Sequence, residues 1–332
     1  MSTATADRFV HSALLYRGDS EYLATTVSFV RAGVAAGEPV AVAVPAARIA
    51  LLRGELGRTA AQIRMVDMAT AGRNPGWILP GILREFADQY PDRPVRIVEE
   101  PIWHGRGVDE YSACVRHEAL VNRSFAGQAV TVRCLYDAER LDRATLADVA
   151  RTHPLVVERG ATRADGRYAP DAVLAAYNTT LPAPANAEMC VVDAAALPRL
   201  RRVATEFGLR QGLSVDRTDD LVLTLTELAT NSIEHAHCAA TVLLGRAHDH
   251  VVCQVRDNGF ISDPLAGRRP VPPAAGRGRG LLMVNHLADL VRVYTVPGRT
   301  ITEVRFATDV VTDPTRAAWP AVDADADAPV RL

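Results

Sequence analysis

The sequence predicts two domains in one chain, first an α/β domain and then an α+β domain. Three observations lead to this prediction: the length of 332 residues, an alternation of strand-like and helix-like segments in the first half, and two hairpin-like strand pairs in the last third. A chain of this length exceeds one typical core and suits two domains of roughly 150 residues each. Because 48% of the residues are hydrophobic, both domains can bury an ordinary core.

In the first domain, apolar runs that suit buried strands occupy residues 39–44, 95–98 and 129–136. Amphipathic helical patterns cover residues 22–36 and 78–89. Strands that alternate with helices in this way predict a mostly parallel sheet with helices on both faces.

The second domain has a different order of elements. A helix is predicted over residues 194–207, ending at Gly208, and a second helix begins after Ser214, an N-cap residue followed by acidic residues. Two hairpin-like strand pairs come next, 241–246 with 251–256 and 291–296 with 302–306. This order predicts helices on one face of a sheet.

A segment rich in Pro and Ala, from Leu181 to Asn186, interrupts the periodic sequence. We therefore predict a first domain at residues 1–181, a linker at 182–187 and a second domain at 188–308. The remaining residues, 309–332, alternate Ala and Asp with few bulky apolar side chains and are predicted to be disordered.

Composition argues against several functions. The formal net charge is -2, which gives no field that would hold a nucleic acid, so direct DNA binding is not expected. No stretch approaches the ~20 apolar residues of a membrane span, and the first residues do not form a signal peptide, so a cytoplasmic protein without a membrane segment is expected. The sequence contains no Lys, which excludes a Walker A loop and Schiff-base chemistry.

The cysteines are scattered along the chain. They form no CxxC pair, and no histidine lies at metal-ligand spacing from them. We therefore expect reduced core residues rather than a metal site. The five are Cys114, Cys134, Cys190, Cys238 and Cys253.

The predicted helix over residues 219–236 carries two polar residues one turn apart, Glu227 and Asn231, beside an apolar stripe that includes Leu225 and Leu228. A carboxylate there can accept a proton or hold water, and an amide oxygen can bind a hard cation such as Mg²⁺. On its own, such a stripe is typical of the solvent-facing side of a surface helix.

Two later segments strengthen the case for a ligand site beside this helix. The strand over residues 251–256 runs into Asp257 and Gly259, which places a carboxylate at a strand end beside a turn. A Gly-rich segment then opens a helix, where main-chain N–H groups and the helix N-terminus suit phosphate. Its residues are Gly276, Gly278, Gly280 and Leu281. Taken singly, these are also the features of a hairpin end and a flexible loop.

In this order the three segments resemble the N, G1 and G2 boxes of the GHKL ATPases, over about residues 190–308. The resemblance implies a Bergerat ATP-binding sandwich with ATP and Mg²⁺ as cofactors. It implies Glu227 as the catalytic base, Asn231 as the Mg²⁺ ligand and Asp257 as the acceptor of the adenine amino group. The backbone around the nucleotide would come from Gly259, Gly276, Gly278, Gly280 and Leu281. Ile261 stands where the family pattern DxGxG has its second glycine.

Three kinds of GHKL protein can be compared with this chain. Histidine kinases carry an acceptor histidine ahead of the ATP domain, and the nearest candidate, His153, is followed directly by Pro. Gyrase, Hsp90 and MutL types need a further domain after the ATP domain, whereas only residues 309–332 follow it in this sequence. The compact form is similar to the RsbW and SpoIIAB anti-sigma factors, which bind a sigma factor and phosphorylate an anti-anti-sigma (STAS) protein. That similarity also implies a homodimer.

The first domain is similar to MEDS sensory domains over about residues 9–181. The similarity lies in Tyr16, the segment 30–39, the segment 134–137 and the segment 152–154. It implies a RecA-like α/β core without a working P-loop. Seven polar and aromatic residues could line a ligand pocket or serve packing and hydrogen bonding alone: His11, Glu99, Trp103, Glu118, Tyr136, Asp137 and His153.

Three hypotheses for the whole chain follow. The first is a cytoplasmic anti-sigma factor with possible Ser/Thr kinase activity, in which the first domain senses a signal. The second is an ATP-binding signalling module without kinase activity. The third is a histidine-kinase-like sensor that acts on a separate protein.

Overall fold

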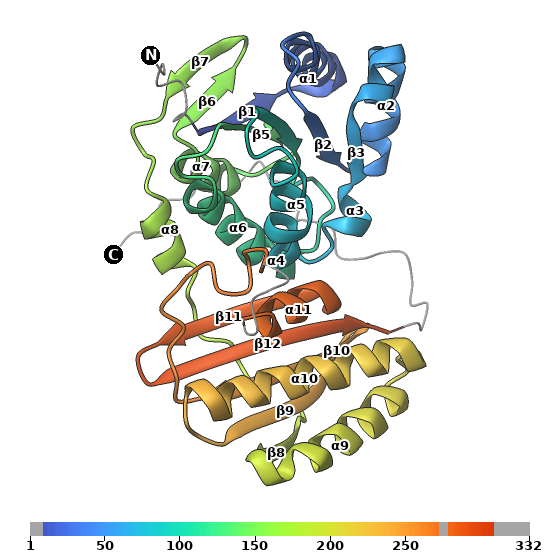
Figure 1. Ribbon diagram of the computed structural model, residues 1–332, viewed down its shortest axis with the longest axis vertical. Helices are drawn as coiled ribbons and strands as arrows, with labels where there is room; N and C mark the ends of the chain where they lie inside the picture. Colours follow the sequence, from blue (N-terminus) through green and yellow to red (C-terminus); the bar gives the residue numbers. More distant parts are fainter. Residues whose placement is uncertain (1–8, 272–277, 309–332) are drawn as a thin grey trace, which may run out of the picture.

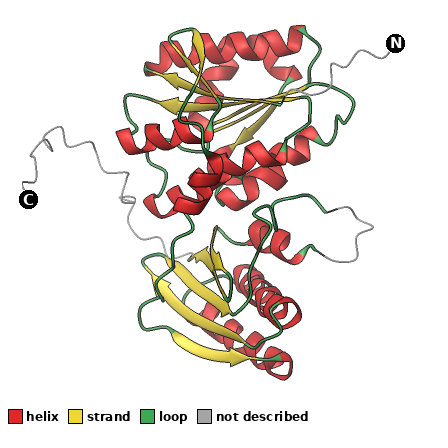
Figure 2. Cartoon of the chain, turned by 90° about the vertical axis from the view of Figure 1, so that its left-hand side faces the viewer, coloured by secondary structure: helices red, strands yellow, loops and turns green. Residues whose placement is uncertain are grey.

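The computed structural model describes residues 9–271 and 278–308. Within them lie a seven-stranded sheet in the first domain and a five-stranded sheet in the second (Figure 1). Helices cover both faces of the first sheet but only one face of the second (Figure 2). The predicted α/β and α+β classes are therefore confirmed.

The first sheet has the strand order β3-β2-β4-β5-β1-β6-β7, and all neighbouring strands are parallel except β6 and β7. The strands are β1 (Val10–Tyr16), β2 (Val40–Val44), β3 (Arg64–Asp67), β4 (Val95–Glu99), β5 (Val130–Asp137), β6 (Leu155–Glu158) and β7 (Ala161–Ala164).

The helices of the first domain lie on opposite sides of this sheet. They are α1 (Gly18–Ala35), α2 (Ala46–Leu56), α3 (Met68–Ala71), α4 (Pro75–Ile78), α5 (Glu85–Ala87), α6 (Tyr111–Ser124), α7 (Arg143–Thr152) and α8 (Pro170–Ala176). A π-helical turn, η2 (Leu79–Arg84), joins α4 to α5.

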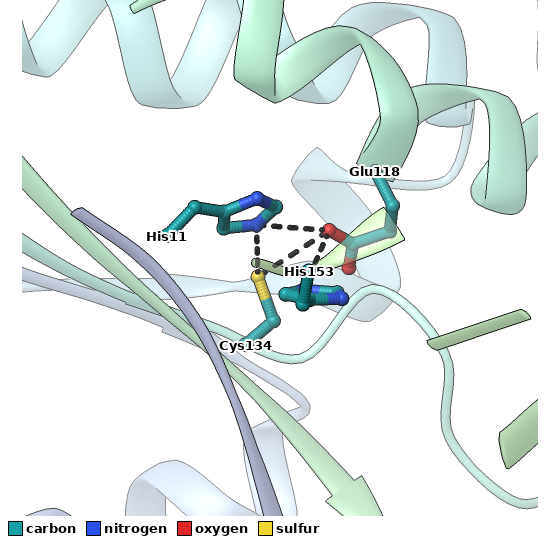
Figure 3. A group of neighbouring side chains, drawn as sticks. All are labelled: His11, Glu118, Cys134 and His153. Atoms are coloured by element: carbon teal, nitrogen blue, oxygen red, sulfur yellow. Dashed lines mark hydrogen bonds and ion pairs between the residues drawn. The ribbon is translucent and has the colours of Figure 1, made fainter. Parts of the chain in front are cut away.

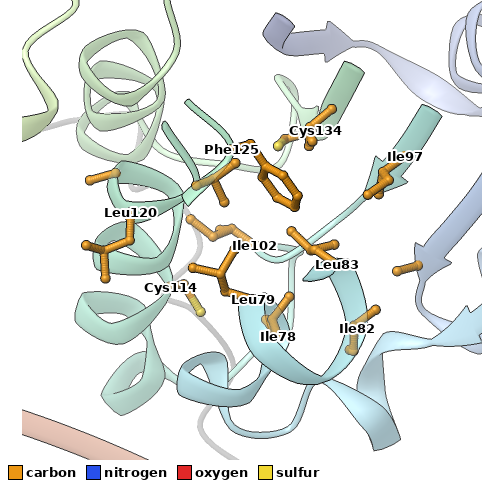
Figure 4. Close-up of a cluster of buried hydrophobic side chains, with 14 of the residues drawn as sticks. Ile78, Leu79, Ile82, Leu83, Ile97, Ile102, Cys114, Leu120, Phe125 and Cys134 are labelled. Atoms are coloured by element: carbon orange, nitrogen blue, oxygen red, sulfur yellow. The ribbon is translucent and has the colours of Figure 1, made fainter. Parts of the chain in front are cut away.

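Two buried clusters, one on each face, explain why the central strands are apolar throughout. Val42 of β2 packs with residues of α1 and α2, whereas its neighbour Ala43 belongs to the other cluster. In that second cluster, Leu83 of η2 and Phe125 lie with Ile97 of β4 (Figure 4). Successive strand residues thus enter different cores, because side chains alternate across a sheet.

The second sheet has the order β11-β12-β10-β9-β8 and is antiparallel throughout. Its strands and the helices beside it are β8 (Glu188–Val192), α9 (Leu197–Arg210), α10 (Val215–His235), β9 (Ala240–Ala247), β10 (His250–Asp257), α11 (Gly280–Leu287), β11 (Leu290–Val296) and β12 (Arg299–Ala307). Both predicted hairpins are present, as β9–β10 and β11–β12.

The predicted end of α9 is wrong. Gly208 does not end the helix, which continues to Arg210. A Cβ atom at residue 208 would lie 3.0 Å from Oγ1 of Thr218 on α10, so the glycine permits close packing between the two helices. Here tertiary contact outweighs the tendency of glycine to end a helix.

The two domains contact each other through α11 and β11. Asn74, which caps α4, donates from Nδ2 to the main-chain oxygen of Asn285 at 2.7 Å. Asn178, after α8, donates from Nδ2 to the main-chain oxygen of Thr295 at 2.7 Å and accepts from its N–H at 3.1 Å. The helix that begins at Gly280 is therefore in direct contact with the first domain (Figure 1).

Candidate functional site

The long helix α10 forms one wall of the candidate site. Its predicted N-cap is correct, since Ser214 Oγ accepts a hydrogen bond from the N–H of Arg217 at 3.3 Å. Leu225 and Leu228 of the apolar stripe are buried. Thr224 lies one turn before Glu227 on the neighbouring polar stripe and is fully buried, so this stripe is not simply a solvent-facing side of the helix.

At the end of β10, the carboxylate of Asp257 is held at both oxygens. Oδ1 accepts from the N–H of Gly259 at 2.7 Å, and Oδ2 accepts from the hydroxyl of Ser232 on α10 at 2.7 Å. Two fixed donors give the carboxylate one orientation, which suits recognition of a ligand amino group.

Gly280, the first residue of α11, lies against the polar residues of α10. A Cβ atom there would be 2.7 Å from Glu227 Oε2 and 3.5 Å from Asn231 Nδ2. Asn231 Nδ2 is buried and has no hydrogen-bond partner. Since buried polar groups are normally paired, this orphaned amide marks a place where a bound molecule would complete the hydrogen bonding.

These residues surround one cavity of about 440 Å³. Six of the residues predicted from the sequence line it: Asn231, Asp257, Gly259, Gly278, Gly280 and Leu281. Glu227 borders the cavity at Gly280, and Gly276 lies outside the described residues. The size is within the range of small-molecule and cofactor sites.

Sequence reasoning missed the contribution of β12. Thr300 pairs with Asp257 in the strand register, lines the cavity and donates from Oγ1 to the main-chain oxygen of Gly259 at 3.1 Å. Its hydroxyl also lies 2.9 Å from that of Thr295. The predicted strand begins only at residue 302, whereas β12 begins at Arg299 and includes Thr300. The alternation of Thr300 and Thr302 was the available signal, because a period of two places both side chains on one face of a strand.

Ile261, which replaces the second glycine of the family pattern, also lines the cavity. Its N–H donates to Oγ1 of Thr295 at 2.9 Å, which ties this loop to β11. The loop after Asp257 therefore has a defined position despite the substitution.

The candidate residues of the first domain divide into two groups. Glu99, Glu118, Tyr136, His11 and His153 form one buried network around Cys134. Cys134 is free and fully buried, as expected of a reduced core residue, but it also lies in contact with these polar side chains. Burial lowers the pKa of His11, which favours the neutral imidazole.

Trp103 and Asp137 have contacts outside this network. Trp103 stacks with the guanidinium of Arg106, at 4.5 Å from the ring centroid. Asp137 accepts from the main-chain N–H groups of Glu139 and Arg140, as expected for a turn after a strand. Their observed contacts serve local structure. All five cysteines are free, and three of them are fully buried.

Each domain matches a known family. Residues 10–154 match the MEDS domain, the methanogen/methylotroph, DcmR sensory domain, and residues 190–306 match the histidine kinase-like ATPase domain. The chain thus has a domain of a sensory family followed by a domain of an ATPase family. The chain joins a MEDS domain to a GHKL-type ATPase domain, as both resemblances predicted, and serine-protein kinases RsbW are among the proteins that its second domain is similar to.

The serine-protein kinase RsbW of Bacillus cereus (strain ATCC 10987 / NRS 248) is 26% identical over 110 residues, which cover 29% of this chain and 69% of the relative. RsbW of Bacillus mycoides (strain KBAB4) is 24% identical over 110 residues, which again cover 29% of this chain and 69% of the relative. Among solved structures, the RsbU and RsbW domains of Rv1364c from Mycobacterium tuberculosis are 18% identical with a TM-score of 0.28, and the match covers 40% of this chain and 34% of that chain. Across the described residues, no helix is long and apolar enough to cross a bilayer.

Proposed function

We propose that the chain is a cytoplasmic anti-sigma factor that binds ATP with Mg²⁺ and takes part in a partner-switching circuit. The observation that carries this proposal is the convergence of Asn231, Asp257 and Gly280 on one cavity, with Glu227 at its border. The similarity to the RsbW serine-protein kinases supports the assignment of this chain to the same type of protein. Its partners would be a sigma factor and an anti-anti-sigma (STAS) protein, with possible Ser/Thr phosphorylation of the latter.

The residues present suit such a ligand. Asp257, held by Ser232 and Gly259, would accept a hydrogen bond from the adenine amino group. Asn231, whose Nδ2 is orphaned, would hold Mg²⁺ through its amide oxygen. The main chain at Gly278, Gly280 and Leu281 would face the phosphates at the N-terminus of α11.

Bound ATP supplies the phosphoryl group, and the protein's part is to position it and to move a proton. Glu227 would accept the proton of a partner's Ser or Thr hydroxyl. No cation in this site can be a Lys, since the sequence has none. Phosphate recognition would therefore depend on main-chain N–H groups, Mg²⁺ and arginine.

Several finer assignments belong to the same proposal. We propose domain bounds of 1–181 and 188–308, with a linker at 182–187, and a homodimer. The order of the parallel strands, with β1 between β5 and β6, supports a RecA-like first domain. Helices on one face of an antiparallel sheet support a Bergerat-type second domain. A tail at 309–332 lies outside the described residues.

The test is transfer from labelled ATP to a candidate anti-anti-sigma protein. Acid-stable label on that partner, lost in Glu227→Ala, is the expected result. Acid-labile label would instead indicate a histidine-kinase-like protein. Asp257→Asn should weaken ATP binding, because an amide can present a donor to the adenine amino group. Unchanged binding by Asp257→Asn would contradict the site assignment.

A second candidate function is ATP binding without phosphoryl transfer, and Ile261 is the observation that favours it. A β-branched side chain at the position of the family's second glycine restricts the loop that lines the cavity. ATP binding with no transfer to any partner would support this function. Transfer that appears in Ile261→Gly would show that this one residue prevents it.

A further inference from the structure

Four buried side chains from distant parts of the first domain meet at one point (Figure 3). His11 lies on β1, Cys134 on β5, Glu118 on α6, and His153 directly after α7. One ligand atom from each lies within 4.8 Å of all the others, and no residue of the four is more than 1% exposed. The proposed ATP-binding function does not use this cluster.

The spacing of the four atoms is that of ligands around one ion. His11 Nε2 lies 3.2 Å from Cys134 Sγ and 3.4 Å from Glu118 Oε2. Glu118 Oε2 in turn lies 3.4 Å from Cys134 Sγ and 3.3 Å from His153 Nε2. Ligands at about 2.0–2.3 Å from a tetrahedral Zn²⁺ lie roughly 3.3–3.8 Å from one another. Three of these four separations lie within this range and the separation of His11 Nε2 from Cys134 Sγ lies just below it, while all four ligand atoms lie within 4.8 Å of one another.

The hydrogen bonds of His11 turn an unprotonated nitrogen toward the cluster. Its Nδ1 lies 3.0 Å from Oδ1 of Asn122. Asn122 donates from Nδ2 to the main-chain oxygens of Glu118, Ala119 and Thr152, so its Oδ1 must be the acceptor. His11 therefore donates from Nδ1, and the neutral ring directs the lone pair of Nε2 at Glu118.

His153 has the same arrangement. Its Nδ1 lies 2.9 Å from the main-chain oxygen of Val149, which can only accept, so Nδ1 carries the hydrogen. Its Nε2 is buried and has no hydrogen-bond partner, although it faces Glu118 Oε2. A histidine that donates one N–H to a backbone carbonyl and directs its other nitrogen into a polar cluster has the usual arrangement of a metal ligand.

The carboxylate of Glu118 is oriented in the same way. Its Oε1 accepts from the hydroxyl of Tyr136, which leaves Oε2 for the cluster. Two imidazole lone pairs, a carboxylate oxygen and a sulfur atom then face one another in a fully buried cluster. A divalent cation that displaced the proton of the Cys134 thiol would bind a thiolate and a carboxylate, whose two negative charges it would neutralise.

We propose that His11, Glu118, Cys134 and His153 bind a divalent transition-metal ion, with Zn²⁺ as the best match. Imidazole and thiolate are ligands for Zn²⁺ and its neighbours in the first row, whereas Mg²⁺ and Ca²⁺ prefer oxygen. Four protein ligands complete a tetrahedron, as in structural zinc sites. The ion would tie β1, β5, α6 and the end of α7 together in the core of the sensory domain.

The test uses the purified full chain, stripped of metal by a chelator and titrated with Co²⁺ alone. We expect about one Co²⁺ per chain, a thiolate-to-cobalt charge-transfer band, the intense visible bands of tetrahedral Co²⁺, and displacement by Zn²⁺. A stripped chain that is folded by circular dichroism and shows none of these bands would overturn the proposal. It would leave a buried network held by shared protons.

Two variants locate the site, and a third serves as the control. Cys134→Ser should lose the charge-transfer band, whereas Cys114→Ser, a fully buried cysteine of the same domain outside the cluster, should keep it. If Cys134→Ser does not fold, Tyr136→Phe is measured in its place, because it removes the hydroxyl that orients Glu118. Tyr136→Phe should weaken Co²⁺ binding about 10–100-fold and should retain the charge-transfer band. Unchanged affinity in Tyr136→Phe, or an unchanged band in Cys134→Ser, contradicts the assignment.

Discussion

The side chain of Asn74 in the sensory domain is hydrogen bonded to the main chain of Asn285 in the ATPase domain, from Nδ2 to the carbonyl oxygen at 2.7 Å. The same side chain accepts from the N–H of Val291 through Oδ1 at 3.3 Å. Asn285 in turn donates from Nδ2 to the main-chain oxygen of Gly267, next to the cavity. Hydrogen bonds of Asn74 and Asn285 therefore connect the N-cap of α4 to a residue that lines the proposed nucleotide site.

Replacement of Asn74 tests this connection. Asn74→Ala leaves the carbonyl of Asn285 and the N–H of Val291 buried without partners, which should lower the free energy of unfolding by about 2–4 kcal/mol. Urea denaturation measures the effect. Gln89→Ala, an exposed amide of the same domain, is the control and should change stability by less than about 0.5 kcal/mol. An equally small change in Asn74→Ala would mean that the two domains do not hold each other through this residue.

Gly280 should be sensitive to a single added methyl group. In Gly280→Ala the new Cβ would lie 2.7 Å from Glu227 Oε2, so the carboxylate must move away. We expect ATP affinity to fall about 10-fold, equivalent to about 1.4 kcal/mol, and any phosphoryl transfer to fall further. Isothermal titration calorimetry measures the affinity.

The matched control is Gly54→Ala in α2, where a Cβ atom would meet nothing within 4 Å. That variant should bind ATP normally and gain up to about 1 kcal/mol of stability from helix propensity. Equal ATP binding by both variants would show that Gly280 is not part of the nucleotide site.

The hydroxyl of Thr300 supports the loop after Asp257, and Thr300→Val removes it with little change of volume. Because the carbonyl of Gly259 loses its donor, we expect a loss of about 1–3 kcal/mol of stability, with weaker nucleotide binding. Thr224→Val is the control, since Oγ1 of Thr224 is buried without a hydrogen-bond partner and its removal should be neutral or stabilising. Thermal unfolding of the two variants compares them, and an equal outcome would rule out a supporting role for Thr300.

Glu100, directly after β4, should make stability depend on pH. Burial raises the pKa of its carboxyl to about 7. The charge of Asp137 adds to this rise, whereas the hydrogen bond from Tyr16 and the charge of Arg48 oppose it. The folded protein therefore retains a proton that the unfolded chain has lost. This contribution is fully present below about pH 4.5 and disappears as the pH rises through about 7.

The size of this effect follows from the difference between about 7 and the ordinary value of 4.5, which at about 1.4 kcal/mol per pKa unit gives about 3 kcal/mol. Glu100→Gln should remove that slope and should be more stable than the natural protein at pH 8. Denaturant unfolding at several pH values measures both curves. Curves of equal slope would mean that Glu100 is ionised throughout this range.

Local sequence patterns predicted the parts of the site that lie within one element. The stripe with Glu227 and Asn231, the strand that ends at Asp257 and the helix that begins at Gly280 each follow from spacing along the chain. The role of Thr300 depends on the pairing of β12 with β10, which is a tertiary feature. Gly208 was misjudged for the same reason, because the packing of α9 on α10 overrides its local tendency.

The cluster around Cys134 could not be found from spacing. His11 and Cys134 lie 123 residues apart, and only the parallel pairing of β1 with β5 brings their side chains together. Metal-ligand patterns read from a sequence assume ligands on one turn or one helix. Ligands from two strands, a helix and a loop leave no such pattern.

The complete burial of His11, Glu118, Cys134 and His153 also has a consequence in time. An ion among them can leave only when the surrounding strands and helices separate, so the rate of its loss would equal the rate of that opening. At high chelator concentration the release rate should then become independent of how much chelator is present. The rate of metal release would thus measure the rate at which the sensory domain opens.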